Sequence, residues 1–210
     1  LKAVRPFRRV DRPRIRHFDA EEITLLLNAC EPDFRALVSG ALLTGCRYGE
    51  LIAMDVGQYA VGSHVRILDS KSGDARVVYL NEEGAAFFDA LTAGRRADEP
   101  LFRRSDGGRW ARSHQARRMV DAARVSRIPP PNNFHVLRHT YASLYLMGGG
   151  SLEGLAKQLG HADTRMTLRS YAHLAEAWRA KEAKAHAPRF GLAIAEGPVR
   201  IASWRGELHR

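Results

Sequence analysis

The sequence predicts a mainly helical α+β domain that carries one small antiparallel β-sheet. Apolar residues recur with helical spacing in several segments that begin at a capping residue. In "DAEEITLLLNAC", for example, Asp19 and Glu22 have the spacing of a capping box. Two strand-like runs, "HVRILD" (64–69) and "ARVVYL" (75–80), flank "SKSG", which is typical of a hairpin loop.

The remaining elements follow from the same signals. Gly45 is placed to end a helix over "FRALVSGALLTG", and "IPPPNN" must interrupt the helical pattern because prolines remove donors and restrict the preceding residue. A further strand near 56–61 is possible. We expect the other helices at "GELIAM", from Asn81 to Leu91, and at "SHQARRMVDAARVS", "HVLRHTYASLYLM", "SLEGLAKQLG" and "AEAWRAKEAKAHA".

The chain divides into three parts. Residues 1–18 are expected to be a basic interdomain linker, residues 19–187 the folded domain, and residues 188–210 a tail. The tail carries apolar residues at roughly alternating spacing and is expected to pack against its own domain or to dock onto another protomer. The first residue is leucine, so we expect the chain to be a fragment of a longer protein.

The charge of the chain points to a polyanionic partner. The net charge is +10, with 33 basic and 23 acidic side chains. Residues 1–16 hold seven basic side chains and one acid, and residues 101–130 hold eight arginines and two acids. Such clustering favours nucleic acid over a general role in solubility. The arginines that we expect to contact DNA are Arg103, Arg104, Arg117 and Arg118.

The cysteines and the hydropathy pattern indicate the compartment. Cys30 and Cys46 lie in apolar stretches without a C-x-x-C pattern, as expected for core residues in a reducing environment. No apolar run approaches the ~20 residues of a membrane span, and no signal peptide is visible. We therefore expect a cytoplasmic protein without membrane contact.

Arginine and glutamate occur three residues apart in "TGCRYGEL". Arg47 follows the expected end of a helix and lies between two apolar segments. An arginine in such surroundings is costly unless its guanidinium meets an anion, which Glu50 or a bound phosphate can supply. Taken alone, the motif fits an ordinary ion pair at a helix junction better.

The motif "HVLRHT" places an imidazole and a guanidinium on one helix face. His135 and Arg138 are three residues apart, and together they suit a phosphate ligand. A histidine that simply caps the helix is an equal alternative. His135 and His139 have the i, i+4 spacing of metal ligands, but Arg138 would repel a cation and no H-E-x-x-H pattern is present.

Three further residues carry weak signals singly. His161 follows Gly160 at a helix end, where a histidine commonly interacts with the helix dipole. Tyr171 has an ordinary pKa near 10, so its ionisation costs about 4 kcal/mol at neutral pH, and nearby cations would lower this cost. Lys71 lies in the expected hairpin loop and, taken alone, is a solvated lysine.

The order of these residues is far more specific than any one of them. Arg-x-x-Glu, a hairpin lysine, His-x-x-Arg, Gly-His and a tyrosine follow one another, and over roughly residues 19–180 the chain resembles the tyrosine recombinases of the phage integrase family. Three sequence motifs also resemble those of the family: "TGCRYGEL", "HVLRHTYAS" and "LGHADTRMTLRSYAHL". The positions that match the family's active site are Arg47, Lys71, His135, Arg138, His161 and Tyr171.

The resemblance implies a catalytic role for each residue. Tyr171 would attack a DNA phosphodiester, form a 3′-phosphotyrosyl link and free a 5′-hydroxyl. Arg47 and Arg138 would hold the nonbridging oxygens, and His161 would donate to the same phosphate. The remaining roles are phosphate positioning and handling of the tyrosine proton by His135, protonation of the leaving oxygen by Lys71, and orientation of the arginines by Glu50.

The resemblance also implies partners and cofactors. The substrate would be double-stranded DNA, bound by a homotetramer on paired sites, and the free protein would be a monomer. No metal, ATP or other cofactor is expected, because cationic side chains surround the phosphate and the phosphotyrosine conserves the bond energy. Family members generally carry a core-binding domain before the catalytic one, so autonomous recombination by this chain is in doubt.

Two other functions remain open. A type IB topoisomerase shares the same chemistry but relaxes supercoils without strand exchange. A non-catalytic helix-turn-helix regulator is compatible with residues 155–174 but leaves the arginines, Lys71 and the His-x-x-Arg pair without a role.

Overall fold

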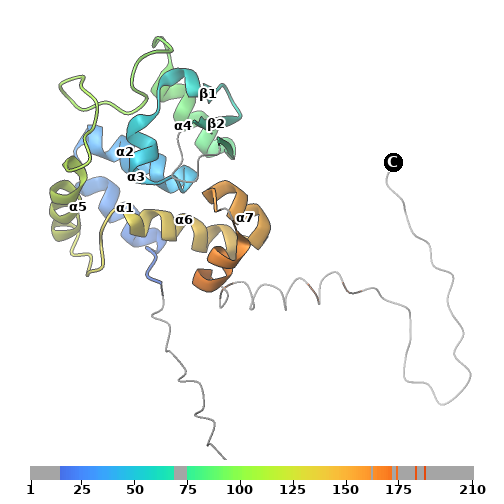
Figure 1. Ribbon diagram of the computed structural model, residues 1–210. Helices are drawn as coiled ribbons and strands as arrows, with labels where there is room; N and C mark the ends of the chain where they lie inside the picture. The colour runs from blue at the N-terminus through green and yellow to red at the C-terminus, as the bar shows by residue number, and fades with distance from the viewer. Residues whose placement is uncertain are drawn as a thin grey trace, which may run out of the picture.

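The computed structural model describes residues 15–68, 75–161, 163–171, 174, 183 and 187. These residues form a mainly helical domain with a small sheet on one side (Figure 1). Helix α6 runs through the middle of the domain, with α1 and α5 toward one end and α7 at the other. The predicted fold class is confirmed.

Most helices begin and end where the local signals predict. Asp19 caps α1 (Ala20–Ala29) through the expected capping box with Glu22. Asn81 caps α4 (Glu82–Thr92), and Ser151 caps α7 (Leu152–Leu159). The other helices are α2 (Pro32–Thr44), α3 (Tyr48–Ala53), α5 (His114–Val125) and α6 (His135–Met147), and residues 164–171 are helical as well.

The sheet has three antiparallel strands in the order β1 (Tyr59–Ala60), β2 (His64–Ile67), β3 (Arg76–Tyr79). Val65 pairs with Val78, and both side chains are fully buried. The strand expected near 56–61 is mostly a 3-10 turn, η1 (Val56–Gln58), because the Gln58 side chain accepts from the Asp55 backbone N–H and closes the chain into a turn. Only the last two residues before the β1–β2 turn are extended.

Two apolar clusters hold the domain together, and α6 contributes to both. The larger cluster lies among α1–α5 and the sheet and includes Val136 and Leu137 from the first turn of α6. The smaller cluster joins the second half of α6, α7 and the helix at 164–171; its buried members are Ala142, Leu146, Leu155, Leu159 and Tyr171. Cys30 and Cys46 are buried free thiols, as predicted.

The folded domain begins before the boundary expected at residue 18. The Phe18 side chain is fully buried, and its backbone N–H donates to Thr140 Oγ1 on α6 at 2.9 Å. The arginines of residues 1–14, Lys71 and the tail from residue 188 lie outside the described residues. No helix in the described part of the chain is long and apolar enough to cross a membrane.

Candidate active site

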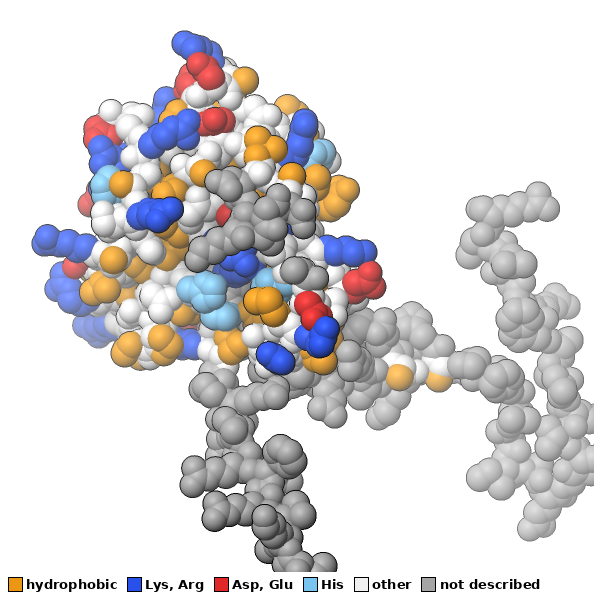
Figure 2. Space-filling view, in the orientation of Figure 1, with side chains coloured by type: hydrophobic (Ala, Val, Ile, Leu, Met, Phe, Trp, Pro, Cys, Tyr) orange, Lys and Arg blue, Asp and Glu red, His pale blue; other side chains and the backbone are white. Residues whose placement is uncertain are grey.

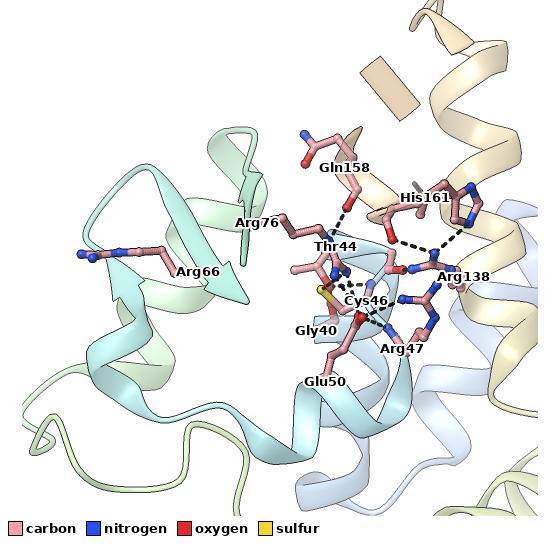
Figure 3. Close-up of polar contacts among 12 residues, drawn as sticks. Gly40, Thr44, Cys46, Arg47, Glu50, Arg66, Arg76, Arg138, Gln158 and His161 are labelled. Atoms are coloured by element: carbon pink, nitrogen blue, oxygen red, sulfur yellow. Dashed lines mark hydrogen bonds and ion pairs between the residues drawn. The ribbon is translucent and has the colours of Figure 1, made fainter. Parts of the chain in front are cut away.

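Two arginines share one buried carboxylate at the start of α3. Glu50, 7% exposed, accepts from Arg47 Nη1 at 2.8 Å and from the Arg47 backbone N–H at 2.8 Å. Arg76, on β3, donates to both oxygens of Glu50 at 3.0 and 2.7 Å. Figure 3 shows Arg47 and Arg76 converging on Glu50, while Arg66 on β2 points away from them.

The charge of Glu50 is stabilised in spite of its burial. Burial by itself raises the pKa of a carboxyl group, but the hydrogen bonds and charge of Arg76, together with the bonds from Arg47, lower the pKa of Glu50 below its ordinary value. Glu50 is therefore ionised at neutral pH, and it fixes Arg47 at the junction between α2 and α3. The sequence predicted this supporting role.

Arg138 joins the C-terminal ends of two helices. Its Nη1 donates to the carbonyl oxygen of Gly45 after α2, and its Nη2 to that of Leu159 at the end of α7, both at 2.8 Å. These carbonyls lack partners within their helices and lie at the negative ends of the helix dipoles. Burial, followed by the charge of Arg47, lowers the pKa of Arg138 to about 10, so the guanidinium stays charged at neutral pH.

Two glycines allow the arginines to reach these helix ends. Gly45 and Gly160 follow α2 and α7 in the left-handed conformation, with φ of 65° and 67°. A Cβ atom on Gly160 would lie 2.7 Å from the side chain of Arg76, and one on Gly45 would collide with the ring of Tyr141. Arg76 Nε also donates to the carbonyl of Gln158, the residue before the last of α7.

His161 is oriented by its two ring nitrogens. Arg138 Nη2 lies 3.0 Å from His161 Nε2, and arginine can only donate, so Nε2 accepts. The proton of the neutral ring is then on Nδ1 and is donated to Thr167 Oγ1 at 2.7 Å. Burial and the nearby charges of Arg138, Arg47 and Arg76 lower the pKa of His161 to about 4. His161 thus contacts Arg138, and in this state its Nε2 carries no proton for a phosphate.

A cleft of about 150 Å³ opens beside these arginines. Its walls include Arg47, His135 and Arg138, which the sequence predicted for one site, and Gln115 from α5, which it did not. The volume is several times the about 30 Å³ that a water molecule occupies in the liquid. In Figure 2, histidine and basic side chains gather over α6 in the middle of the visible face.

Tyr171, on the helix at residues 164–171, contacts α6 through His139. Its side chain is 2% exposed, and its hydroxyl is 2.5 Å from Nδ1 of His139. The ring of His139 stands edge-on to that of His135, with centroids 4.6 Å apart. Burial raises the pKa of Tyr171 to about 12, although the charge of Arg138 lowers it in part. The hydroxyl is therefore protonated, and it shares a hydrogen bond with Nδ1 of His139.

The structure brings five of the predicted residues into one region. Arg138 bonds to His161; Arg47 and His135 share its cleft; and Glu50 holds Arg47. Tyr171 is linked to His135 through the ring of His139. Lys71 lies outside the described residues.

The sequence does not predict Arg76 or Gln115 as part of this site, although an arginine at the start of a buried strand is an available signal. It indicates His139 only as half of a metal pair, and the position of His139 next to Arg138 gives no indication that it faces Tyr171.

The arginines predicted to bind DNA each have an acidic neighbour. Arg118 is paired with Asp33 at 2.8 Å and lies over the Trp110 ring, so it also ties α5 to α2. Arg103 pairs with Glu99 and Arg104 with Asp106. Arg117 is the most available of the four, because its side chain is 94% exposed and its nearest carboxylate, on Asp121, is 3.7 Å away.

Comparison with known proteins identifies the family. The family model described as "Phage integrase family" matches residues 16–177. The chain belongs to the phage integrase family. The predicted family and enzyme class, a tyrosine recombinase, are confirmed.

Three relatives illustrate the range of this family. The tyrosine recombinase XerA of Saccharolobus solfataricus is 29% identical over 80% of this chain and 56% of its own length. The catalytic domain of bacteriophage HP1 integrase has a TM-score of 0.64 and 27% identity, covering 83% of this chain and 96% of that domain. The XerH site-specific recombinase, solved with its difH substrate, has a TM-score of 0.60 and 20% identity over 82% of this chain and 53% of its own, which shows the fold alone. The chain spans about half the length of the curated relatives it matches.

Proposed function

We propose that this chain is the catalytic part of a site-specific DNA recombinase that cleaves and rejoins strands through Tyr171. One observation carries the proposal: segments far apart in the sequence bring Arg47, His135 and Arg138 to the walls of one cleft. His161 bonds to Arg138, and the hydroxyl of Tyr171 contacts His139, the residue after Arg138. Two guanidinium groups and an imidazole are suited to the dispersed charge of a phosphodiester in its transition state.

The donors that remain free on the arginines support this role. The described residues provide acceptors for three of the five N–H groups of Arg138, which leaves two for a phosphate. Arg47 uses one side-chain nitrogen on Glu50, and its side chain is 32% exposed. The two arginines can therefore bind nonbridging oxygens without giving up the contacts that position them.

The roles of His161 and Lys71 follow from the family resemblance. His161 Nε2 accepts from Arg138, so donation to a phosphate requires a proton on that nitrogen after DNA binds. Lys71 would protonate the leaving 5′ oxygen. Replacing that oxygen by sulphur should restore cleavage to Lys71→Ala, because a thiolate leaves without the proton that an alkoxide needs.

A covalent trap tests the proposal. The chain would be incubated with a pool of nicked duplexes whose sequence around the nick is randomised, and protein–DNA adducts would be separated on a denaturing gel. We expect an adduct with the natural chain and none with Tyr171→Phe, which should still bind DNA. An adduct of undiminished yield in Tyr171→Phe would refute the assignment of the nucleophile. Cleavage should persist in EDTA.

The same trap separates the alternative functions. A regulator without catalysis would form no adduct. A type IB topoisomerase would form one and relax supercoiled plasmid, but would not exchange strands between two copies of the selected site. Strand exchange by this chain, alone or joined to a core-binding domain, supports the recombinase.

The DNA surface is proposed to include the outer side of α5, where basic side chains gather in Figure 2. Arg117→Glu should weaken binding and reduce its salt dependence by about one phosphate contact, or a slope of roughly 0.9. Arg96→Glu, on the loop after α4, makes the same charge change at another exposed arginine and is the control. Equal effects of the two variants would show that α5 has no special role.

Assembly is proposed to involve the tail. On paired sites we expect a homotetramer in which residues 188–210 of one protomer dock onto another, and a monomer in the absence of DNA. Deletion of residues 189–210 should reduce assembly on paired sites, measured by analytical ultracentrifugation, and leave single-site binding nearly intact. Unchanged assembly would show that the tail is dispensable.

A further inference from the structure

His139 is the side chain that contacts the hydroxyl of Tyr171. Its Nδ1 lies 2.5 Å from that oxygen, and the two rings are tilted by 56° with centroids 5.9 Å apart. The contact joins residues 32 positions apart. The family resemblance assigns the handling of the tyrosine proton to His135. This residue lines the cleft with Arg47 and Arg138. The two histidines of α6 thus face different groups.

We propose that His139 takes the hydroxyl proton of Tyr171 when the tyrosine attacks DNA, and returns it when the strand is rejoined. This inference rests on the proposed function, in which Tyr171 is the nucleophile. His139 is a catalytic residue in this scheme because it touches the attacking oxygen, whereas His135 faces the phosphate.

The proton balance is complete in both directions. In cleavage, Tyr171 Oη bonds to phosphorus, the bond from phosphorus to the 5′ oxygen breaks, and the hydroxyl proton moves to Nδ1 of His139. The leaving oxygen receives its proton from a separate acid, the proposed Lys71. In rejoining, the 5′-hydroxyl attacks phosphorus and returns its proton to Lys71. The bond from phosphorus to Tyr171 Oη breaks, and the departing tyrosine oxygen recovers its proton from the His139 imidazolium.

The surroundings of His139 keep its ring neutral in the absence of DNA. Burial and the charges of His135 and Arg138 lower the pKa of His139 to about 4, so the ring is neutral before DNA binds. A phosphodiester in the cleft would offset the positive charge of Arg138, and the basicity of His139 would then rise. Proton acceptance would thus be favoured only when the substrate phosphate is present.

His64 and Tyr79 supply an internal control for a merely structural pair. Their rings have centroids 5.9 Å apart and are tilted by 55°, nearly the same arrangement as His139 and Tyr171. This pair lies on β2 and β3, and its histidine bonds to Ser63 instead of the tyrosine hydroxyl. The pairs differ in the hydrogen bond to the phenol and in burial, because Tyr79 is 65% exposed and Tyr171 2%.

The central experiment uses His139→Asn in the full chain. The amide of asparagine places an oxygen near the former Nδ1 position, so it can still accept from Tyr171 but cannot take up the proton. We expect single-turnover cleavage of the selected nicked duplex to slow by about 10²-fold or more, with DNA binding and thermal unfolding close to those of the natural chain. His64→Asn should cleave at the natural rate.

A second nucleophile distinguishes proton transfer from positioning. Incorporation of a fluorinated tyrosine at position 171 gives a hydroxyl that ionises more readily, so it should need the base less. In that background His139→Asn should slow cleavage by less than about threefold. An equal loss in both backgrounds would show that His139 only positions Tyr171, and no loss in either would show that it has no role; both results overturn the proposal.

Two further observations keep the test decisive. If His139→Asn does not fold, His139→Asp puts a carboxylate oxygen at the same position that can take up the proton. It should cleave faster than His139→Ala, and equal rates of the two variants overturn the proposal. An adduct that persists in Tyr171→Phe would refute the nucleophile itself, a failure of the proposed function that is visible without any change at His139.

Discussion

The arginines of the site and its tyrosine are held by different parts of the molecule. Arg47 and Arg138 are fixed by ion pairs and helix-end carbonyls beside the larger apolar cluster. Tyr171 belongs to the smaller cluster, and its hydroxyl has one hydrogen-bond partner among the described residues, His139. Helix α6 belongs to both halves, with Arg138 and His139 as adjacent residues.

This difference teaches how the site can be both rigid and adjustable. The phosphate side is anchored through several directed bonds, so displacement of an arginine would leave buried polar groups without partners. The tyrosine side depends mainly on the packing of a few apolar side chains. We expect the tyrosine side to open at lower free energy than the arginine side, which suits a nucleophile that must meet its substrate.

The strongest way to break the arginine side is Glu50→Ala. Arg76, whose side chain is 9% exposed, would keep its charge and lose its carboxylate. Loss of one partner of a buried ion pair costs about 3–5 kcal/mol of unfolding free energy. Urea denaturation should show this loss, whereas Asp106→Ala, at the more exposed pair with Arg104, should cost less than about 1 kcal/mol. Equal costs would mean that the Glu50 cluster does not anchor the site.

Replacement of Arg47 should separate chemistry from stability. Its side chain is partly exposed and bonds to Glu50 alone among the described residues, while Arg76 can still neutralise that carboxylate. Arg47→Ala should slow cleavage by about 10²–10³-fold, as expected for loss of one preorganised charged donor, with a smaller effect on DNA binding. Cleavage within about threefold of the natural rate, measured in single turnover, would contradict the phosphate clamp.

The tyrosine side can be loosened through Leu155. This residue of α7 is fully buried in the cluster that contains Tyr171. Leu155→Ala should cost about 2–5 kcal/mol by removing buried methyl groups and leaving a cavity. Hydrogen exchange should accelerate at residues 164–171 more than in α2, where Leu37 lies in the larger cluster. Uniform acceleration in both regions would show that the two halves open together.

A change of pH should have the smallest effect on the two sides of the site. The pKa values of His139 and His161 are lowered from 6.5 to about 4, so between these values the unfolded chain binds more protons than the folded one. Stability should therefore fall as the pH drops from about 6.5 toward 4, by up to about 1.4 kcal/mol per pH unit for each imidazole. Chemical denaturation of His139→Asn and His161→Asn should show flatter profiles. The pKa of Glu50 is lowered from its ordinary value, so its protonation affects stability only at pH values below this range.

Features that depend on neighbours within a few residues could be predicted from the sequence. Asp19 and Glu22, Asn81, Ser151 and Gly45 mark helix ends because a cap is made within one turn of the chain. The family could also be recognised from the sequence, because its signal is the order of several residues and not any single one. These residues are Arg47, His135, Arg138, His161 and Tyr171. The pairing of Glu50 with Arg47 is local in the same way, because the two residues are three positions apart.

Contacts between distant segments could not be predicted from the sequence and became visible in the folded domain. Arg76 meets Glu50 across 26 positions, and His139 meets Tyr171 across 32, so neither pairing follows from a spacing rule. The pairing of Arg118 with Asp33 across 85 positions also decides how much charge the arginine-rich segment presents to a partner. Local bonds are fixed by backbone geometry, whereas these pairs exist because packing of α6 and α7 against the rest of the domain places their groups together and away from water.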